Sequence, residues 1–76
     1  MSRKPLLNDL VELLEDVPSD FSDDMIPSGT RGTVVECYDQ PTEGYSVDLA
    51  IPDGSLVGGF RHENVVLMPH QFAVRE

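Results

Sequence analysis

The side chains of this sequence that are best suited to covalent chemistry are one cysteine and two histidines. A Cys/His nucleophile needs its thiol within hydrogen-bond reach of a base that a third group orients. Cys37, His62 and a neighbouring acid are the candidates for such a site. Cys37 follows Val35 at a spacing of two in a β-branched run, which places both residues on one face of a strand. We therefore expect Cys37 to be a buried, reduced and inert core residue.

Metal binding would require several ligands at suitable spacing. A closed zinc site needs four convergent cysteine or histidine ligands, and the sequence offers only Cys37, His62 and His70. The acidic run Asp20, Asp23 and Asp24 lacks the glycine-centred loop of twelve residues and the terminal glutamate of a calcium-binding hand. The sequence predicts a solvated loop at this run, with no metal site and no cofactor.

Acid–base and phosphate chemistry are also poorly supported. Glu15 and Asp16 are adjacent carboxylates, but consecutive strand residues face opposite sides of a sheet and cannot easily share a substrate. Gly29 and Gly32 are not followed by the Gly-Lys-Ser/Thr of a phosphate-binding loop. No convergent acid, base and nucleophile can be drawn from the chain, so we expect a protein that is not an enzyme.

Apolar runs separated by turn residues predict five short strands. A short turn or helix is expected at residues 5–9, and Pro18 ends the first strand because proline cannot continue the hydrogen-bonded ladder. A single helical turn is expected at residues 61–64, before the last strand. The expected strands are residues 10–17, 33–38, 45–51, 56–60 and 65–68.

Residues 45–51 show the clearest alternation of apolar and polar side chains, which predicts a strand with one buried face and one wet face. Residues 52–54 form a tight turn into the next strand, where Gly58 and Gly59 indicate a bulge or a sharp bend. The expected core includes Leu13, Val35, Val47 and Leu49.

A long exposed loop is expected at residues 18–32, which are rich in proline, glycine, serine and aspartate. Phe21, Met25 and Ile26 are expected to fold back from it onto the core. Five short strands at close spacing favour a small barrel over a sandwich. The expected fold is thus all-β (mainly β), with residues 1–9 as an N-terminal arm, 10–68 as the barrel and 69–76 as a tail that frays or docks through Phe72 and Val74.

A resemblance to known proteins supports this arrangement. Gly29 and Gly32 around Arg31, followed by GTVVE, a Tyr-x-Val-x-Leu strand and an Asp-Gly turn, resemble SH3-like barrels of the KOW type. Over residues 10–68, the order VELLEDVP, GTVVE, GYSVDL, PDG and VVLM is similar to a bacterial family of small SH3-like proteins catalogued as domain of unknown function 4926. That family has no established activity, so the resemblance implies a five-stranded SH3-like barrel and no catalytic residue.

The resemblance also bears on partners. Some members of the family are encoded beside small partner proteins, in arrangements like those of toxin and antitoxin pairs. KOW-type barrels hold RNA with lysine and arginine near the glycine turn, whereas this chain has Arg31 alone there and an acidic loop before it. A partner protein encoded nearby is therefore expected, and direct RNA binding is not.

Charge and cysteine content narrow the function further. A net charge of -9 has the wrong sign for a phosphate backbone. A lone cysteine cannot form an intramolecular disulfide, which favours a reducing cytoplasm. The apolar start is interrupted by acids, unlike a signal peptide, and no apolar run approaches the roughly 20 residues of a membrane span. We expect a cytoplasmic protein, monomeric or weakly oligomeric, without membrane or nucleic-acid contacts.

Three functions remain open. The first is a non-enzymatic acidic module that docks on a basic partner protein. The second is an antitoxin-like or inhibitory protein that blocks a nucleic-acid channel of its partner, and the third is an accessory subunit of an enzyme complex. The acidity gathers in the first third of the chain, where it could steer association, and an exposed tyrosine could supply an apolar anchor. The expected contact residues are Glu12, Glu15, Asp16, Asp20, Asp23, Asp24 and Tyr38.

Overall fold

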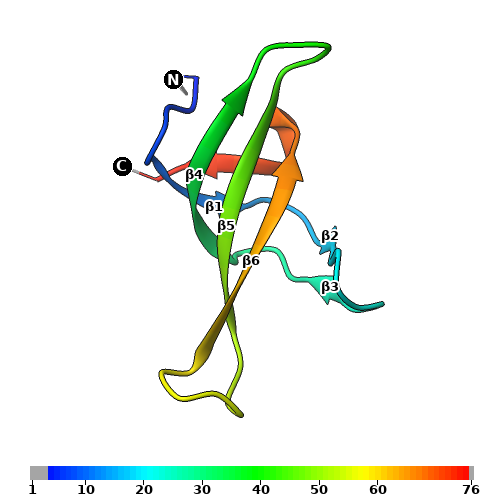
Figure 1. Ribbon diagram of the computed structural model, residues 1–76, viewed down its shortest axis with the longest axis vertical. Coiled ribbons are helices and arrows are strands. Elements are labelled where there is room, and N and C mark those ends of the chain that lie inside the picture. Colours follow the sequence, from blue (N-terminus) through cyan, green and yellow to red (C-terminus); the bar gives the residue numbers. More distant parts are fainter. Residues whose placement is uncertain (1–3, 76) are drawn as a thin grey trace.

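The computed structural model describes residues 4–75, which form short strands and one 3-10 turn (Figure 1). The first half of the chain contains β1 (Leu10–Leu13), β2 (Val17–Pro18), β3 (Met25–Ile26) and β4 (Arg31–Tyr38). The second half contains β5 (Gly44–Pro52), β6 (Phe60–Leu67), η1 (Pro69–Gln71) and β7 (Phe72–Val74).

The strands form an antiparallel sheet of five, in the order β6-β5-β4-β1-β7, and a separate small hairpin of β2 and β3. The mainly β fold is confirmed, but the five strands of the sheet are not the five predicted ones, because residues 56–59 form a loop and β7 is an additional strand. Within the described residues β6 and β7 are the two edges of this sheet and do not pair with each other, so the sheet is curved and open rather than a closed barrel.

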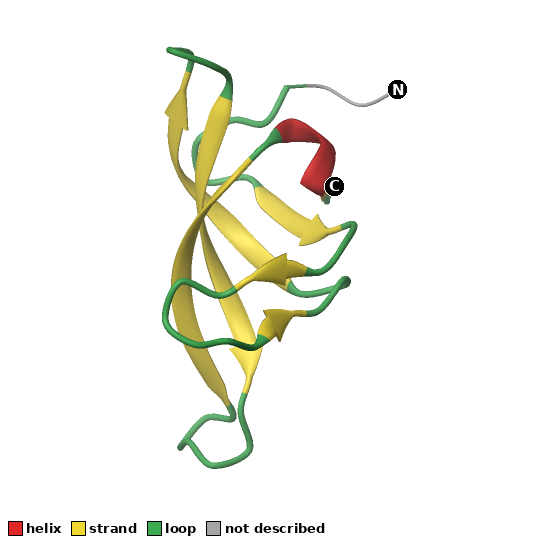
Figure 2. Ribbon diagram, turned by 90° about the vertical axis from the view of Figure 1, so that its right-hand side faces the viewer, coloured by secondary structure: helices red, strands yellow, loops and turns green. Residues whose placement is uncertain are grey.

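The core lies between the long strands and the short ones, which Figure 2 shows on opposite sides of the molecule. The predicted alternation over 45–51 is confirmed, because its four apolar side chains are all buried. The predicted core residues Leu13, Val47 and Leu49 are each at most 1% exposed. Buried hydrophobic residues from the sheet and the β2–β3 hairpin complete the cluster: Val11, Val17, Ile26, Val34, Tyr45, Ile51, Val65, Leu67 and Phe72.

A β-bulge in β4 overturns the prediction for Val35. The register passes from Val34 opposite Val47 to Glu36 opposite Ser46, so Val35 is the extra residue. Val34 is completely buried, whereas Val35 is 44% exposed. The expectation that Val35 lies in the core was wrong because a β-branched run does not reveal where a bulge inverts the alternation.

Cys37 is exposed, which contradicts the predicted burial. Beyond the bulge, Cys37 lies opposite Tyr45 in β5 and shares its face. Tyr45 is buried, with its ring edge-to-face against Phe72 at 5.5 Å between centroids. Cys37 is the penultimate residue of β4, and the packing that buries Tyr45 does not extend over Cys37.

The predicted first strand, 10–17, is divided. β1 ends at Leu13, and β2 begins at Val17 in the other sheet. Leu13 N–H donates to the Thr30 carbonyl at 2.8 Å, and the Leu13 carbonyl accepts from Gly29 N–H. The next amide, that of Leu14, points to the other neighbour of β1 and donates to the Gln71 carbonyl, just before β7.

The loop predicted at 18–32 contains the β2–β3 hairpin and the start of β4. Of its three expected core plugs, Ile26 is buried as predicted, at 1% exposed. Phe21 and Met25 are 78% and 54% exposed, so that prediction was wrong for both. In the hairpin Ile26 lies opposite the buried Val17, whereas Met25 lies opposite the exposed Pro18 on the other face.

The region after β5 also differs from the prediction. Residues 56–59 form a loop with 53–55 rather than a strand, and Gly58 and Gly59 have φ values of 90° and 77° in it. β6 runs from Phe60 to Leu67, through the residues predicted as a helical turn at 61–64. Continuous pairing with β5 from Phe60 onward overrides the polar composition of this segment.

The helical turn occurs later, as η1 at Pro69–Gln71. The Gln71 side chain holds it by accepting from Met68 N–H at 2.8 Å. Residues after it form β7, which pairs with β1 and buries Phe72 to 4% exposure. The tail expected at 69–76 thus docks on the sheet through Phe72, with Val74 packed against the core.

Candidate functional site

The most exposed aromatic side chain of the described chain lies on the loop between β2 and β3, residues 19–24, hereafter the acidic loop. Phe21 is 78% exposed. Asp20, Asp23 and Asp24 surround it in sequence and are also exposed. Among residues 4–75 these carboxylates have no ion-pair partner. The acidic loop therefore combines an apolar ring with unneutralised negative charge.

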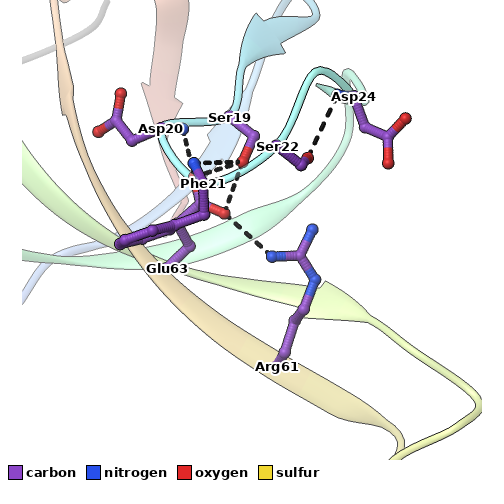
Figure 3. A network of polar contacts seen from close by, with 7 residues as sticks. All are labelled: Ser19, Asp20, Phe21, Ser22, Asp24, Arg61 and Glu63. Carbon is purple, nitrogen blue, oxygen red and sulfur yellow. Dashed lines mark hydrogen bonds and ion pairs between the residues drawn. The ribbon is translucent and has the colours of Figure 1, made fainter.

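A buried carboxylate of β6 holds this loop in place (Figure 3). The side chain of Glu63 is fully buried. It accepts hydrogen bonds from the Ser19 hydroxyl at 2.9 and 3.0 Å and from the Asp20 N–H at 2.9 Å. Its other contact is an ion pair with Arg61 at 3.0 Å. Both carboxylate oxygens are thus engaged, and the start of the loop is fixed to the sheet.

The environment of Glu63 keeps it charged. Burial raises the pKa of this carboxyl, but hydrogen bonds from Asp20 and Ser19 and the Arg61 guanidinium lower it by more, so the pKa of Glu63 is below its ordinary value. A buried charge is tolerated when it is paired and fully hydrogen-bonded. This saturated carboxylate positions a loop and has no free oxygen to act as a base.

Serine side chains shape the rest of the acidic loop. The Ser19 hydroxyl accepts from Phe21 N–H at 3.1 Å, and the Ser22 hydroxyl accepts from Asp24 N–H at 3.2 Å. The Ser19 N–H donates to the Asp24 carbonyl and closes the loop at its base. Such local bonds from serine to nearby amides are typical of tight turns. They fix the backbone from which Phe21 projects.

The other predicted contact residues do not join this group. Glu12 lies on β1 and forms ion pairs with Arg75 at 2.5 Å and with Arg31 at 3.8 Å, so its charge is offset. Asp16 accepts a hydrogen bond from Ser28 N–H at 2.8 Å. Both carboxylates are therefore occupied by contacts within the chain.

Tyr38 and Glu15 lie elsewhere on the surface. Tyr38 ends β4, beside the β4–β5 turn, which projects from a different side of the molecule than the β2–β3 hairpin (Figure 1). Glu15 is exposed between β1 and β2. The structure thus gathers Asp20, Asp23 and Asp24 into one site and leaves Tyr38 outside it.

The Cys37 and His62 pair is not assembled. Cys37 lies opposite Tyr45 of β5 and His62 lies opposite Ala50, five residues along the same strand. At the rise of a β-strand this separation is about 17 Å. The His62 imidazole instead lies 3.4 Å from the Asp48 carboxylate.

A shallow apolar groove of about 510 Å³ lies beside the first residue of β6, Phe60. Phe60, 53% exposed, contributes its only aromatic wall. Further apolar surface comes from Leu56 and Val57 in the adjacent β5–β6 loop, which are 45% and 104% exposed. The groove is lined by Pro27, Ser28, Gly29, Thr30, Arg31, Ala50, Pro52 and Phe60.

Within residues 4–75, no group of three or more histidine, cysteine, aspartate or glutamate side chains could hold a metal ion. No helix of this part of the chain is long and apolar enough to cross a membrane.

Sequence reasoning missed Glu63 and the exposure of Phe21. Glu63 is separated by two from Val65 and by four from Leu67, the inward positions of β6. Reading 60–67 as one strand would have placed a carboxylate among core residues and required a partner for it. That signal was hidden because 61–64 was interpreted as a helical turn.

Comparison with known families gives one result. Residues 7–58, more than half of the chain, match the family described as Domain of unknown function (DUF4926). The chain belongs to this family, as the order of its β motifs suggested. Searches of curated proteins and of solved structures give no match.

Proposed function

We propose that the protein is a non-enzymatic, SH3-like docking module that binds a basic partner protein through the acidic loop. The observation that carries this proposal is Phe21, which is 78% exposed beside three carboxylates that lack ion-pair partners in the described chain. The single 3-10 turn before the last strand of a five-stranded sheet supports the SH3-like assignment. The free thiol of Cys37 supports a reducing, cytoplasmic location.

The geometry of the loop favours binding in three ways. Glu63 and the loop serines order the backbone before a partner arrives, which reduces the entropy lost on association. An aromatic side chain on such a backbone is a suitable hot-spot anchor. The aspartates around Phe21 would attract a positively charged surface and raise the association rate.

The experiment begins with the partner captured from native cells on the wild-type protein. Association of that partner is then followed by stopped flow for the double variant Asp23→Lys, Asp24→Lys. At low salt we expect association to be slower by about tenfold or more. The difference should shrink towards physiological salt, where the Debye length is about 8 Å.

A matched control changes the same charge elsewhere. Glu36 and Asp39 are exposed carboxylates near the opposite turn, and the double variant Glu36→Lys, Asp39→Lys should associate much faster than the loop variant. Phe21→Ala should mainly accelerate dissociation, because it removes an anchor and no charge. Equal association rates for both double variants at both salt concentrations would exclude the acidic loop as the steering surface.

A further inference from the structure

The free edge of β6 carries a row of hydrogen-bonding groups that can be identified from its pairing with β5. Asp53 N–H donates to the Gly59 carbonyl at 2.8 Å, and the next pair joins Phe60 to Pro52, which has no N–H. Antiparallel pairs alternate between those that exchange both backbone bonds and those that exchange none. The pair of Phe60 and Pro52 therefore exchanges no backbone bond, and the same holds for every second pair after it along β6.

It follows that four residues of β6 direct their N–H and C=O groups away from β5. Phe60 and Val66 are 53% and 56% exposed, and His62 and Asn64 are also exposed. No other described residue donates to or accepts from the backbone of these four. Unpaired backbone groups persist where water can reach them. The outward-directed residues are Phe60, His62, Asn64 and Val66.

β6 is the longer of the two free edges. β7, the other edge strand, has three residues, and its neighbour Arg75 already donates its N–H to Leu10. β6 has eight residues. A long edge of unpaired amides and carbonyls is a template for another extended chain.

The charges beside this edge favour a basic occupant. Glu63 binds Ser19 and Asp20 at the start of the acidic loop and so holds this loop against β6 (Figure 3). The two basic residues of β6 are offset, because Arg61 pairs with Glu63 and His62 lies against Asp48. Asp20, Asp23 and Asp24 of the acidic loop have no ion-pair partner in the described chain.

We propose that β6 accepts an extended, lysine- or arginine-rich segment of the partner protein as an additional strand of the sheet. The inference rests on the proposed docking function and specifies its partner. Backbone hydrogen bonds to the edge supply affinity, and the acidic loop selects basic side chains. A second copy of this chain is disfavoured as the occupant because each copy has a net charge of -9.

A synthetic peptide of alternating lysine and valine tests the proposal on the wild-type protein. Amide hydrogen exchange is followed by NMR with and without the peptide at low salt. Exchange of His62, Asn64 and Val66 should slow by about tenfold or more, while Arg61 and Val65, whose amides point to β5, should change little. A glutamate–valine peptide should produce no slowing.

The variant Asn64→Pro removes one outward N–H without removing a bond to β5, a position at which an edge strand tolerates proline. Relative to the control Asn64→Ala, it should weaken binding of the lysine–valine peptide about tenfold. Should Asn64→Pro fail to fold, the complementary bonds are removed instead, those in which N–H groups of the peptide donate to outward carbonyls of β6. A lysine–valine peptide N-methylated at alternate residues should then bind wild-type protein about tenfold more weakly.

Several outcomes would overturn strand addition. They are unchanged exchange at the three amides, equal binding of the glutamate peptide, absence of binding, or slowing that follows protein concentration without peptide and so identifies a second copy. If the lysine peptide binds without protecting the edge, and binding is lost in Asp23→Lys, Asp24→Lys, the docking function survives and the edge proposal fails. If the edge is protected equally in that variant, the acidic loop is not the selecting element and the docking proposal fails.

Discussion

The carboxylate of Glu63 connects the sheet to a surface loop, and its protonation should therefore control stability. Its pKa is lowered in the folded state because hydrogen bonds and Arg61 outweigh burial. A lowered folded-state pKa stabilises the protein above the ordinary glutamate value of about 4.3. That stability is lost as the pH falls through the folded-state pKa.

Replacing Glu63 by glutamine should lower the free energy of unfolding at neutral pH by about 2 kcal/mol, since a charge-assisted network loses its acceptor. The variant should also lose part of the acid sensitivity below about pH 4.3. Urea unfolding at several pH values measures both effects. Glu36→Gln, at an exposed site, is the control and should change stability by less than about 0.5 kcal/mol. Identical pH profiles for Glu63→Gln and wild type would contradict the assigned role.

Cys37 provides a second test at the scale of one residue. Its exposure on β4 predicts that a thiol reagent will label it in native conditions within about tenfold of the rate in urea. Labelling is followed by absorbance at neutral pH. Strong native protection would mean that the face of β4 beyond the bulge is covered, as the sequence alone suggested.

At the scale of the element, β4 must approach β5 closely before the bulge. A Cβ at Gly32 would lie 2.6 Å from the Asp48 carbonyl and 2.9 Å from Val47 Cγ1. Neither backbone nor a buried valine can give way easily. Gly32→Ala should therefore destabilise the protein by about 3 kcal/mol, the upper range for overpacking.

Gly54→Ala is the matched control for this prediction. Gly54 lies in the β5–β6 loop, and a Cβ there would meet nothing within 4 Å. Its effect on the urea midpoint should correspond to less than about 0.5 kcal/mol. Equal midpoints for Gly32→Ala and Gly54→Ala would mean that β4 and β5 can separate at Gly32 without cost.

The elements also show which features a sequence can reveal. The alternation of apolar and polar residues over 45–51 identified β5, because buried and less buried side chains alternate along this central strand. Val35 could not be placed, because a bulge shifts the alternation without any glycine or proline to mark it. The sequence divided β6 between the end of one predicted strand, a helical turn and another strand. The polar run 61–64 becomes a strand only through pairing with β5.

For the candidate site, the acidic composition of residues 20–24 was visible in the sequence, and the orientation of Phe21 was not. A lone phenylalanine is usually buried, whereas here Phe21 is exposed on a loop that is bound at Asp20 by Glu63, more than forty residues away in sequence. Glu12 was predicted as part of the same surface, but Arg75 from the far end of the chain offsets its charge. Contacts between distant segments therefore decide which acids remain available.

At the scale of the whole molecule, the net charge is -9, and ion pairs neutralise only some of the carboxylates. The carboxylates of Glu12 and Glu63 are paired with arginines inside the described chain. Those of Asp20, Asp23 and Asp24 are not, so three carboxylates without ion-pair partners lie on the single loop between β2 and β3. In the proposed docking function, this loop, more than the total charge, attracts the basic partner.

The place of β1 in the sheet affects how the chain can fold during synthesis. β1, at residues 10–13, lies between β4 and β7, and β7 begins only at Phe72. Pairings this distant in sequence close late, because chain entropy opposes them. A nascent chain that ends before Phe72 keeps one side of β1 unpaired and leaves the Tyr45 ring without its aromatic neighbour. Translation must therefore have passed Phe72 before β1 acquires its second neighbour.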